Sequence, residues 1–567
     1  MNILGISCYY HDSSAVLIQD GKVVAAIAEE RLSRKKHDND FPRLAIAWCL
    51  SWGNLSMDEI DLIAFYEKPL VKFERVLAQH LDAFPRGGKA FREHISSWFS
   101  RKLKLKETLK REFGYNKEIW YIPHHLSHAA SAYYLSGFNK ATIVTIDGVG
   151  EWATTTIGSA QGNAIRIDKE IRFPNSLGLL YSAVTAYLGF EVNDAEYKVM
   201  GYAAYGNASR YSDCFDKLLH IFPDGSFELD PSYFTYAWSD RMYNRKLETL
   251  FGLPTRPKES GVQQEYADVA AGLQSSLEKA AYALLTAAYK RHKSKNLCLA
   301  GGVALNSVMN GKLLSHTPFT NIFIPPDPGD AGGAMGAALY ASVKTSRKRT
   351  PNTFFPNLGP SYPSEQITSV LNSYGLSFTH LESDEILVNT VSALLAKEKV
   401  IGWFQGRMEW GPRALGFRSI LASAGKLEMK DIINAKIKHR ELFRPFAPVI
   451  LKEKVHEYFK TDKTISESAK YMLFVYPFTA KGQKRVPATV HVDNTGRLQI
   501  IDRTDNPLYY DLIKAFWKKT GTPVILNTSF NVRGEPIVCS PRNAIECFLK
   551  TDIDFLVIGS YLVAKHG

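Results

Sequence analysis

Three short segments in the C-terminal third of the chain combine basic residues with glycine, proline or small polar residues. They are GTPVILNTSFNVRGEPIVCSPR (521–542), GRMEWGPRALGFRS (406–419) and KIKHRELFRP (436–445). Arginine forks bind phosphate bidentately, and glycine lets backbone N–H groups approach it closely. A solvated charged face or a structural turn explains each segment singly. The presence of three such segments within about one domain length favours a binding site for a phosphorylated small molecule.

The segment YIPHHLSHAASAYY (121–134) carries histidines at metal-ligand spacing. His124 and His128 lie four residues apart, on one face of the predicted helix, and His125 points away. The segment is not a zincin motif, because no glutamate follows the first histidine. Asp330, which precedes a glycine-rich helix, is the best candidate for a third ligand. Two imidazoles and one carboxylate suit iron, manganese or zinc, whereas capping or core histidines are the alternative.

Two segments alternate strand, glycine loop and helix, at 296–313 and 322–341. This order presents helix N-termini to phosphates in α/β proteins. We therefore predict nucleotide binding at Gly301, Gly302 and Asn306, together with Asp147.

The elements that must position these residues begin with a repeated pattern. Strands are expected at 3–7, 15–19 and 23–28, with an Asp20-Gly21 hairpin turn, and the pattern returns at 141–173. Each copy has an acidic residue, Asp12 or Asp147, in its first turn. The pattern predicts a duplicated α/β unit with a cleft between its halves.

A proline-rich basic stretch near residues 344–363 reads as a linker. We predict an α/β protein with a first domain at 1–346, a linker at 347–363 and a second domain at 364–567. In the second domain, helices are expected around 386–397, 428–437 and 507–519, and strands at 400–404, 446–451 and 523–527.

Composition limits the function classes. The chain has 567 residues, a net charge of +12 and six cysteines, none in a C-x-x-C pair, which argues against a zinc ribbon or an iron–sulfur cluster. The scattered positive charge favours small anionic substrates over nucleic acid. No apolar run is long enough to cross a bilayer, and the N-terminus lacks the features of a signal peptide. We expect a cytoplasmic protein without a membrane partner.

Ten ordered motifs resemble the O-carbamoyltransferases of the NodU/CmcH family, and most of all the tobramycin carbamoyltransferase type, over essentially the full chain. They are HDSSAVL (11–17), EERLSRKKHD (29–38), HHLSHAASAYY (124–134), EYKVMGYAAYG (196–206), LAGGVALN (299–306), DAGGAMGA (330–337), GPRALGFRSILA (411–422), HRELFRPFAP (439–448), HVDNTGRLQ (491–499) and NTSFNVRGEPIV (527–538).

The resemblance implies a fold and a reaction. The first domain is similar to the tRNA threonylcarbamoyl-transfer ATPases of the actin/sugar-kinase/heat-shock superfamily, and the second to YrdC. The family converts carbamoyl phosphate and ATP to carbamoyl-adenylate. It then transfers the carbamoyl group to a hydroxyl of a sugar, an antibiotic or another secondary metabolite.

The resemblance also implies roles for individual residues. A divalent metal, with Fe(II) expected, is held by His124, His128 and Asp330, and Mg accompanies ATP. His11 is the candidate base, and Asp12, Lys36 and Glu196 face the acceptor. Carbamoyl phosphate is bound by Arg418, Lys438, Arg444, Arg497, Asn527 and Ser529.

Other classes of function remain open at this stage. A tRNA threonylcarbamoyl-type protein fits the related folds and the positive charge. A hydrogenase-maturation carbamoyl carrier requires C-x-x-C zinc fingers, which the chain lacks. A non-catalytic scaffold is disfavoured by the intact histidine, aspartate and arginine sets. The sequence does not name the acceptor or the oligomeric state, for which a homodimer is one alternative.

Overall fold

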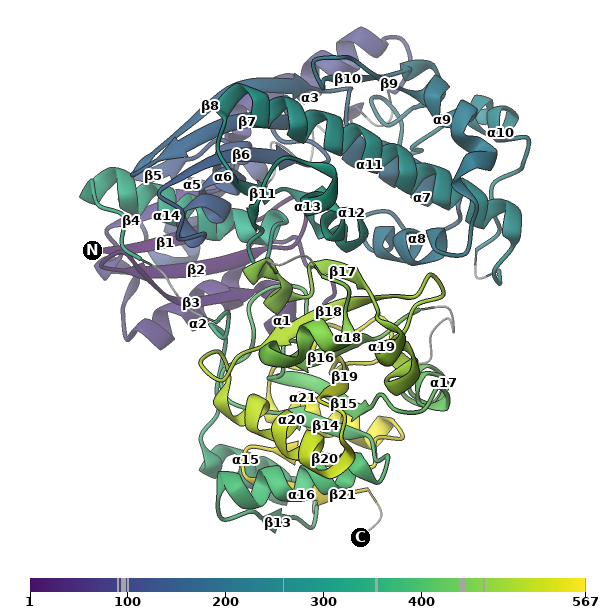
Figure 1. Ribbon diagram of the computed structural model, residues 1–567. Helices are drawn as coiled ribbons and strands as arrows, with labels where there is room; N and C mark the ends of the chain where they lie inside the picture. The colour runs from purple at the N-terminus through teal and green to yellow at the C-terminus, as the bar shows by residue number, and fades with distance from the viewer. Residues whose placement is uncertain are drawn as a thin grey trace. The chain divides into compact units, whose positions relative to one another are not determined.

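A computed structural model describes residues 1–88, 91–92, 98, 101–258, 260–351, 355–438, 444–461 and 465–565. The chain divides into two compact units (Figure 1). Unit 1 comprises Met1–Glu29 and His37–Thr353, and unit 2 comprises Glu30–Lys36 and Phe354–Gly567.

The division at residues 353 and 354 falls within the predicted linker. The short segment Glu30–Lys36 differs from the expectation, because it belongs to unit 2 rather than to a continuous first domain at 1–346. The reason is a pair of long-range contacts. The Arg34 guanidinium donates hydrogen bonds to the carbonyls of Ile537 (2.6 Å) and Pro536 (2.7 Å).

The first sheet of unit 1 has the order β3-β2-β1-β4-β5. Its strands are β1 (Asn2–Ser7), β2 (Ser14–Gln19), β3 (Lys22–Ala28), β4 (Leu62–Phe65) and β5 (Ile119–Tyr121). The first three form an antiparallel meander, whereas β4 and β5 run parallel to β1. Asp20 and Gly21 both have positive φ, as a tight two-residue hairpin turn requires.

The second sheet repeats this arrangement, with the order β12-β11-β6-β7-β8. Its strands are β6 (Lys140–Ile146), β7 (Ala153–Gln161), β8 (Ala164–Arg172), β11 (Asn296–Ala300) and β12 (Asn321–Phe323). Again an antiparallel meander is followed by two strands parallel to its first member. The predicted duplication is therefore confirmed by strand order and direction.

One helix follows the last strand of each sheet, and the two helices pack together. These are α6 (His124–Leu135) after β5 and α14 (Asp330–Ser346) after β12. Gly336 permits the close approach, because a Cβ there would lie 1.8 Å from the Ser127 carbonyl oxygen. The N-termini of both helices carry residues predicted to bind metal.

The other elements of unit 1 surround this framework. The long helix α11 (Gln264–His292) is largely buried. The remainder are α2 (Arg43–Gly53), α3 (Pro69–Ala83), α5 (Leu105–Phe113), α7 (Leu177–Tyr187), α8 (Glu196–Ala203), α9 (Ser212–Leu218), α10 (Arg245–Phe251), α12 (Ser307–Gly311), α13 (Leu313–His316) and the hairpin of β9 (Leu219–Ile221) and β10 (Phe227–Leu229).

Unit 2 is built on a nine-stranded mixed sheet with the order β13-β21-β20-β14-β15-β19-β16-β18-β17. The strands are β13 (Thr379–His380), β14 (Ile401–Phe404), β15 (Arg418–Ser423), β16 (Ala447–Leu451), β17 (Phe474–Pro477), β18 (Thr495–Ile501), β19 (Val524–Ser529), β20 (Phe555–Ile558) and β21 (Tyr561–Ala564). The helices are α15 (Ser364–Ser373), α16 (Asp384–Ala396), α17 (Glu428–Ile432), α18 (Val455–Tyr458), α19 (Ala480–Arg485), α20 (Pro507–Thr520) and α21 (Pro541–Lys550), and α1 (Glu29–Ser33) spans the junction of the units.

The α/β class is confirmed in both units, and the predicted strands of unit 2 correspond to β14, β16 and β19. The helix expected at 428–437 is interrupted: α17 ends at Ile432, and a wider helical turn runs over Ile433–Lys438. Among the described helices, none combines the length and apolar character needed to span a bilayer.

Candidate functional site

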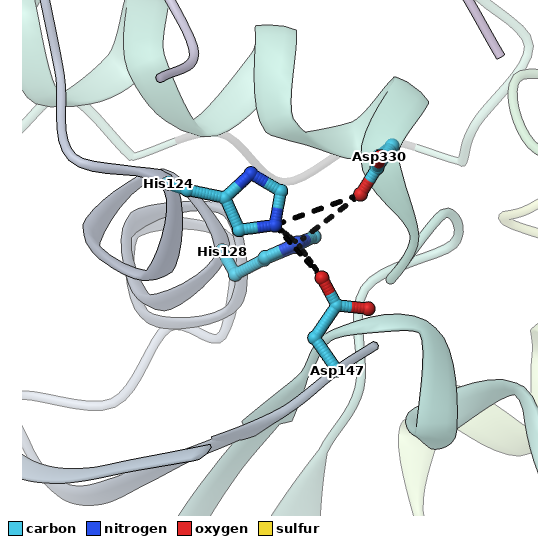
Figure 2. Close-up of side chains that lie close together, drawn as sticks. All are labelled: His124, His128, Asp147 and Asp330. Carbon is cyan, nitrogen blue, oxygen red and sulfur yellow. Dashed lines mark hydrogen bonds and ion pairs between the residues drawn. The ribbon is translucent and has the colours of Figure 1, made fainter. Parts of the chain in front are cut away.

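Four side chains from three elements converge in unit 1 (Figure 2). His124 begins α6 and His128 lies one turn further along it. Asp147 follows β6 directly, and Asp330 is the first residue of α14. His124 and His128 are completely buried, and both carboxylates are nearly so. The packing of α6 on α14 thus brings both helix N-termini to the end of β6.

The separations in this cluster are close to those of ligands around one ion, with Asp330 slightly further away. The Nε2 atoms of His124 and His128 lie 3.1 Å apart. Asp147 Oδ2 lies 2.8 Å and 3.4 Å from these nitrogens, and Asp330 Oδ1 lies 3.7 Å and 3.6 Å from them. Ligand atoms about 2.1 Å from a shared metal lie about 3.0–3.4 Å apart. Two imidazoles and two carboxylates therefore fit a divalent transition metal.

The electrostatics of the cluster favour a bound cation. Burial alone would raise the pKa of Asp147, but hydrogen bonds from both histidines lower it well below its usual range. Burial likewise opposes a charged His128, yet the two carboxylates raise its pKa to about 10. One Asp330 oxygen, Oδ2, is buried without a hydrogen-bond partner among the described residues. Two buried carboxylates need positive charge beside them, which a protonated His128 or a bound cation supplies.

His125 is excluded from the cluster by its hydrogen bonds. Its Nδ1 lies 2.7 Å from Thr145 Oγ1, and its Nε2 lies 2.8 Å from the Ala153 carbonyl. Burial lowers its pKa to about 3, so the ring is neutral. The prediction that His125 points away from the other two histidines is confirmed.

Two acidic residues that support the cluster were not assigned this role from the sequence. Asp147, predicted to bind nucleotide, lies in the metal cluster. Glu151 accepts hydrogen bonds from the backbone N–H groups of His124 (2.9 Å) and Lys68 (2.8 Å). A carboxylate at this position suits a helix N-terminus and fixes α6 where its histidines begin. For Asp147, the only signal in the sequence was its position immediately after a predicted strand.

The glycine loop after β11 contacts the same centre. The Gly302 N–H donates to Asp147 Oδ1 over 2.9 Å. Gly301 has φ +94°, and a Cβ there would lie 2.3 Å from the Ile146 carbonyl oxygen, so only glycine fits. Asn306 caps α12 and exchanges hydrogen bonds with Gln274. Of the predicted nucleotide residues, Gly301 and Gly302 thus lie beside Asp147, whereas Asn306 lies at the start of α12.

A second cluster surrounds His11, the candidate base. The two Asp12 oxygens contact His11 Nδ1 (2.7 Å) and His37 Nδ1 (2.8 Å). His37 Nε2 contacts Asp194 (2.9 Å), and His11 Nε2 lies 2.6 Å from the Asn193 carbonyl. Burial disfavours the charged form of His11, but Asp12 raises its pKa to about 9. Both ring nitrogens face acceptors, so His11 is protonated in this arrangement.

The acceptor residues predicted from the resemblance are distributed over both units. Glu196 accepts hydrogen bonds from Ser182 Oγ (2.8 Å) and from the Asn193 N–H (2.9 Å), which orders the loop beside His11. Asp12 also lies in unit 1, whereas Lys36 belongs to unit 2.

In unit 2, Arg418 is fully buried at the start of β15. Its two Nη atoms donate to the carbonyls of Gln405, Phe417, Pro360 and Gly406 at 2.6–3.1 Å. Burial lowers its pKa to about 10. Of the three guanidinium nitrogens of Arg418, only Nε has no hydrogen-bond partner among the described residues. In this arrangement the guanidinium organises the 406–419 segment.

Of the other predicted carbamoyl-phosphate residues, Lys438, Asn527 and Ser529 lie near the end of β19. Lys438 Nζ contacts the carbonyl and the hydroxyl of Ser529 and both oxygens of Asn531. Asn527 donates to the Ala414 carbonyl and to Gln499 Oε1. Arg497 extends from β18, and the Arg444 carbonyl accepts a hydrogen bond from Asn434. Residues 439–443 of the basic segment lie outside the described residues.

Sequence comparisons identify the class of protein. Residues 2–339 match the family described as Carbamoyltransferase N-terminus, and residues 392–565 match Carbamoyltransferase C-terminus. This chain therefore belongs to the carbamoyltransferase family, in its NodU/CmcH group, and is an enzyme of the carbamoyltransferase class. The resemblance to the tobramycin type stays a prediction.

Individual relatives align over nearly the whole chain. An uncharacterized protein of Synechocystis sp. is 45% identical, covering 100% of this chain and 97% of its own length. The nodulation protein NolNO of Sinorhizobium fredii is 38% identical over 98% of this chain and 79% of its own length. Nodulation protein U of the same organism is 27% identical, covering 96% of both.

Proposed function

We propose that this enzyme is an ATP-dependent O-carbamoyltransferase. It converts carbamoyl phosphate and ATP to carbamoyl-adenylate, and then transfers the carbamoyl group to a hydroxyl of a small acceptor such as a sugar, an antibiotic or another secondary metabolite. The observation that carries this proposal is the shared use of Asp147 by the metal cluster and the glycine loop of unit 1.

The reaction balances in three steps. Water first cleaves carbamoyl phosphate into carbamate and phosphate. The carbamate oxygen then attacks the α-phosphorus of ATP, and pyrophosphate leaves. Finally the acceptor oxygen attacks the carbamoyl carbon, AMP leaves with the electron pair of the broken C–O bond, and the acceptor hydroxyl loses its proton.

Residues of unit 1 suit the last step. His124, His128, Asp147 and Asp330 would hold a divalent ion, iron in our proposal, with Mg accompanying ATP. Such an ion neutralises phosphate charge and polarises a carbonyl. The Gly301-Gly302 backbone approaches phosphate oxygens closely, as glycine loops before helices do.

His11 is proposed to receive the acceptor proton in its neutral form, after Nε2 has lost the proton that faces the Asn193 carbonyl. The Asn193 carbonyl oxygen is hydrogen-bonded to His11 Nε2 in this structure. An arriving acceptor hydroxyl must therefore displace that carbonyl. Asp12 holds the opposite nitrogen and stabilises the imidazolium once the proton has moved.

Unit 2 is proposed to bind carbamoyl phosphate through Arg444, Arg497, Lys438, Asn527 and Ser529, with Arg418 shaping the loop above β15. The clustering of Lys438 and Ser529 supports this assignment. A closed, basic environment protects carbamate, which decays in water. The six free cysteines accord with a cytoplasmic enzyme.

The experiment is to follow pyrophosphate release with purified full-length enzyme, ATP and carbamoyl phosphate. We expect release to require both substrates, and carbamoyl product to form when a hydroxylated acceptor is added. Carbamoyl transfer without pyrophosphate release would contradict the adenylate route. A tRNA-directed function predicts instead a salt-dependent complex with tRNA, which a gel-shift series would detect.

A further inference from the structure

A group of basic side chains, two of them buried and one half-buried, lies in unit 1 outside the residues discussed above. Lys72 and Arg75 lie three residues apart on one face of α3, with exposed fractions of 1% and 6%. Lys102 begins a short 3-10 helix, Lys102–Lys104. Buried lysine and arginine are rare unless they are paired.

The described residues supply too few counter-charges for this group. Lys72 Nζ is 2.5 Å from Glu67 Oε2, and this pair is buried. Arg75 donates from Nη1 to the neutral amide of Gln79 (2.9 Å), while its Nε is buried without a partner. The Lys102 ammonium lies 4.6 Å from the centre of the Trp98 ring and has no carboxylate partner in the described part of the chain. Three cations thus share one direct carboxylate.

The pKa values of Lys102 and Arg75 are both lower than usual. Burial, followed by the charge of Lys72, lowers the pKa of Lys102 to about 8. Burial also lowers the pKa of Arg75, although Tyr10 and the charges of Glu67 and Glu151 partly oppose this effect. Burying a cation without its counter-ion is costly, and a bound anion removes that cost.

Tyr10 connects this group to the reaction site. The Lys72 ammonium lies 4.2 Å from the centre of the Tyr10 ring. Tyr10 precedes His11, and its hydroxyl lies 4.0 Å from the position of a Cβ on Gly148, the residue after Asp147. One tyrosine side chain therefore reaches from the basic group to the metal cluster.

We propose that Lys72, Arg75, Lys102 and Tyr10 form an anion pocket for a phosphate monoester carried by the acceptor. After Glu67 is counted, the group has two excess positive charges, which match the charge of about −1.5 to −2 of a phosphate monoester at pH 7. The assignment of the phosphate to the acceptor rests on the proposed function, whereas the anion pocket itself does not. Free phosphate has the same chemistry, so the experiment distinguishes the two sources.

The test measures the reactivity of Lys102 in the full-length protein. Acetic anhydride at pH 8 acetylates unprotonated amines, and mass spectrometry of peptides gives the rate at each lysine. We expect 10 mM glucose 6-phosphate to slow acetylation of Lys102 roughly tenfold, because a charge-assisted contact holds the amine. Sodium chloride at equal ionic strength and glucose are the comparison additions. Lys104, which is exposed in the same short helix, is the internal control and should not respond.

Variants and a second anion make each outcome decisive. Arg75→Gln should lose the protection, and Arg75→Lys, which retains the charge, should keep part of it. Unchanged acetylation of Lys102 with both glucose 6-phosphate and inorganic phosphate would overturn the pocket. Protection by inorganic phosphate alone would overturn the assignment to the acceptor. Because no turnover is needed, these results stand even if the enzyme fails to release pyrophosphate, an outcome that would contradict the proposed function only.

Discussion

At the scale of single residues, the cluster in unit 1 depends on the atom that each side chain presents. His124 and His128 present Nε2 to the two carboxylates, while His125 between them has both nitrogens occupied by Thr145 and Ala153. Neighbouring histidines in one helix therefore have different surroundings. The difference can be tested by substituting each in turn.

His124→Ala should lower metal affinity by at least 10- to 100-fold, because three remaining ligands hold an ion less tightly than four. Elemental analysis of purified protein after dialysis measures the effect. His125→Gln is the matched control and should retain the metal of the wild type. Equal metal content in His124→Ala and wild type would contradict the site.

Asp12 should set the pH dependence of carbamoyl transfer. A base acts in its deprotonated form, so with a His11 pKa of about 9 the rate should rise with pH, reach half its maximum near pH 9 and level off above that pH. Asp12→Asn removes the carboxylate that raises this pKa, which should bring it toward the ordinary value of about 6.5 and move the plateau to lower pH. Transfer rates measured from pH 6 to 10 check this expectation. Identical profiles for both proteins would mean that His11 is not the titrating base.

At the scale of elements, the contact between α6 and α14 sets the geometry of the site. Each helix follows the last strand of one sheet and carries ligands at its N-terminus. Their close approach requires residues without large side chains at the crossing, as at Gly336. The site is therefore sensitive to a residue that carries no chemistry.

Gly336→Ala should separate the two helices, because the new Cβ would lie 1.8 Å from the Ser127 carbonyl oxygen. We expect a loss of about 1–3 kcal/mol in the free energy of unfolding, as for overpacked cores. Metal content should fall as well, since Asp330 moves away from the histidines. Gly261→Ala, where a Cβ meets nothing within 4 Å, is the control. Denaturant unfolding and elemental analysis measure the two effects, and stability like that of the control would show that the helices adjust.

At the scale of the whole molecule, the two units carry different proposed steps. Unit 1 holds the candidate metal cluster and His11, whereas unit 2 holds Lys438 beside Ser529 of β19. Adenylate formation and carbamoyl transfer should then respond differently to substitutions in each unit.

His11→Ala should leave pyrophosphate release largely intact and slow product formation by roughly 100- to 10,000-fold, because only transfer needs a proton acceptor. Arg444→Ala should instead raise the carbamoyl-phosphate concentration required for both readings by more than about tenfold, through loss of a charged contact. Both products are measured in parallel at saturating ATP. A common decrease of pyrophosphate and product in His11→Ala would indicate that one site serves both steps.

Local periodicity predicted the repeated strand pattern, a helix within residues 121–134 and the shared face of His124 and His128. The sequence also identified the family, since ten motifs occur in order. It did not assign Asp147 to the metal cluster, because that residue arrives from another strand through the packing of α6 on the second sheet.

Which charged residues are buried depends on how distant segments pack together. In the sequence, Lys72 and Arg75 resemble ordinary surface residues. Arg418 resembles an arginine whose guanidinium is available to bind phosphate. Burial and backbone carbonyls from distant segments determine their surroundings. The same holds for residues 30–36, which Arg34 fixes to unit 2 through two carbonyls some 500 residues away in the chain. Such contacts have no local signature, since they depend on which segments the folded chain brings together.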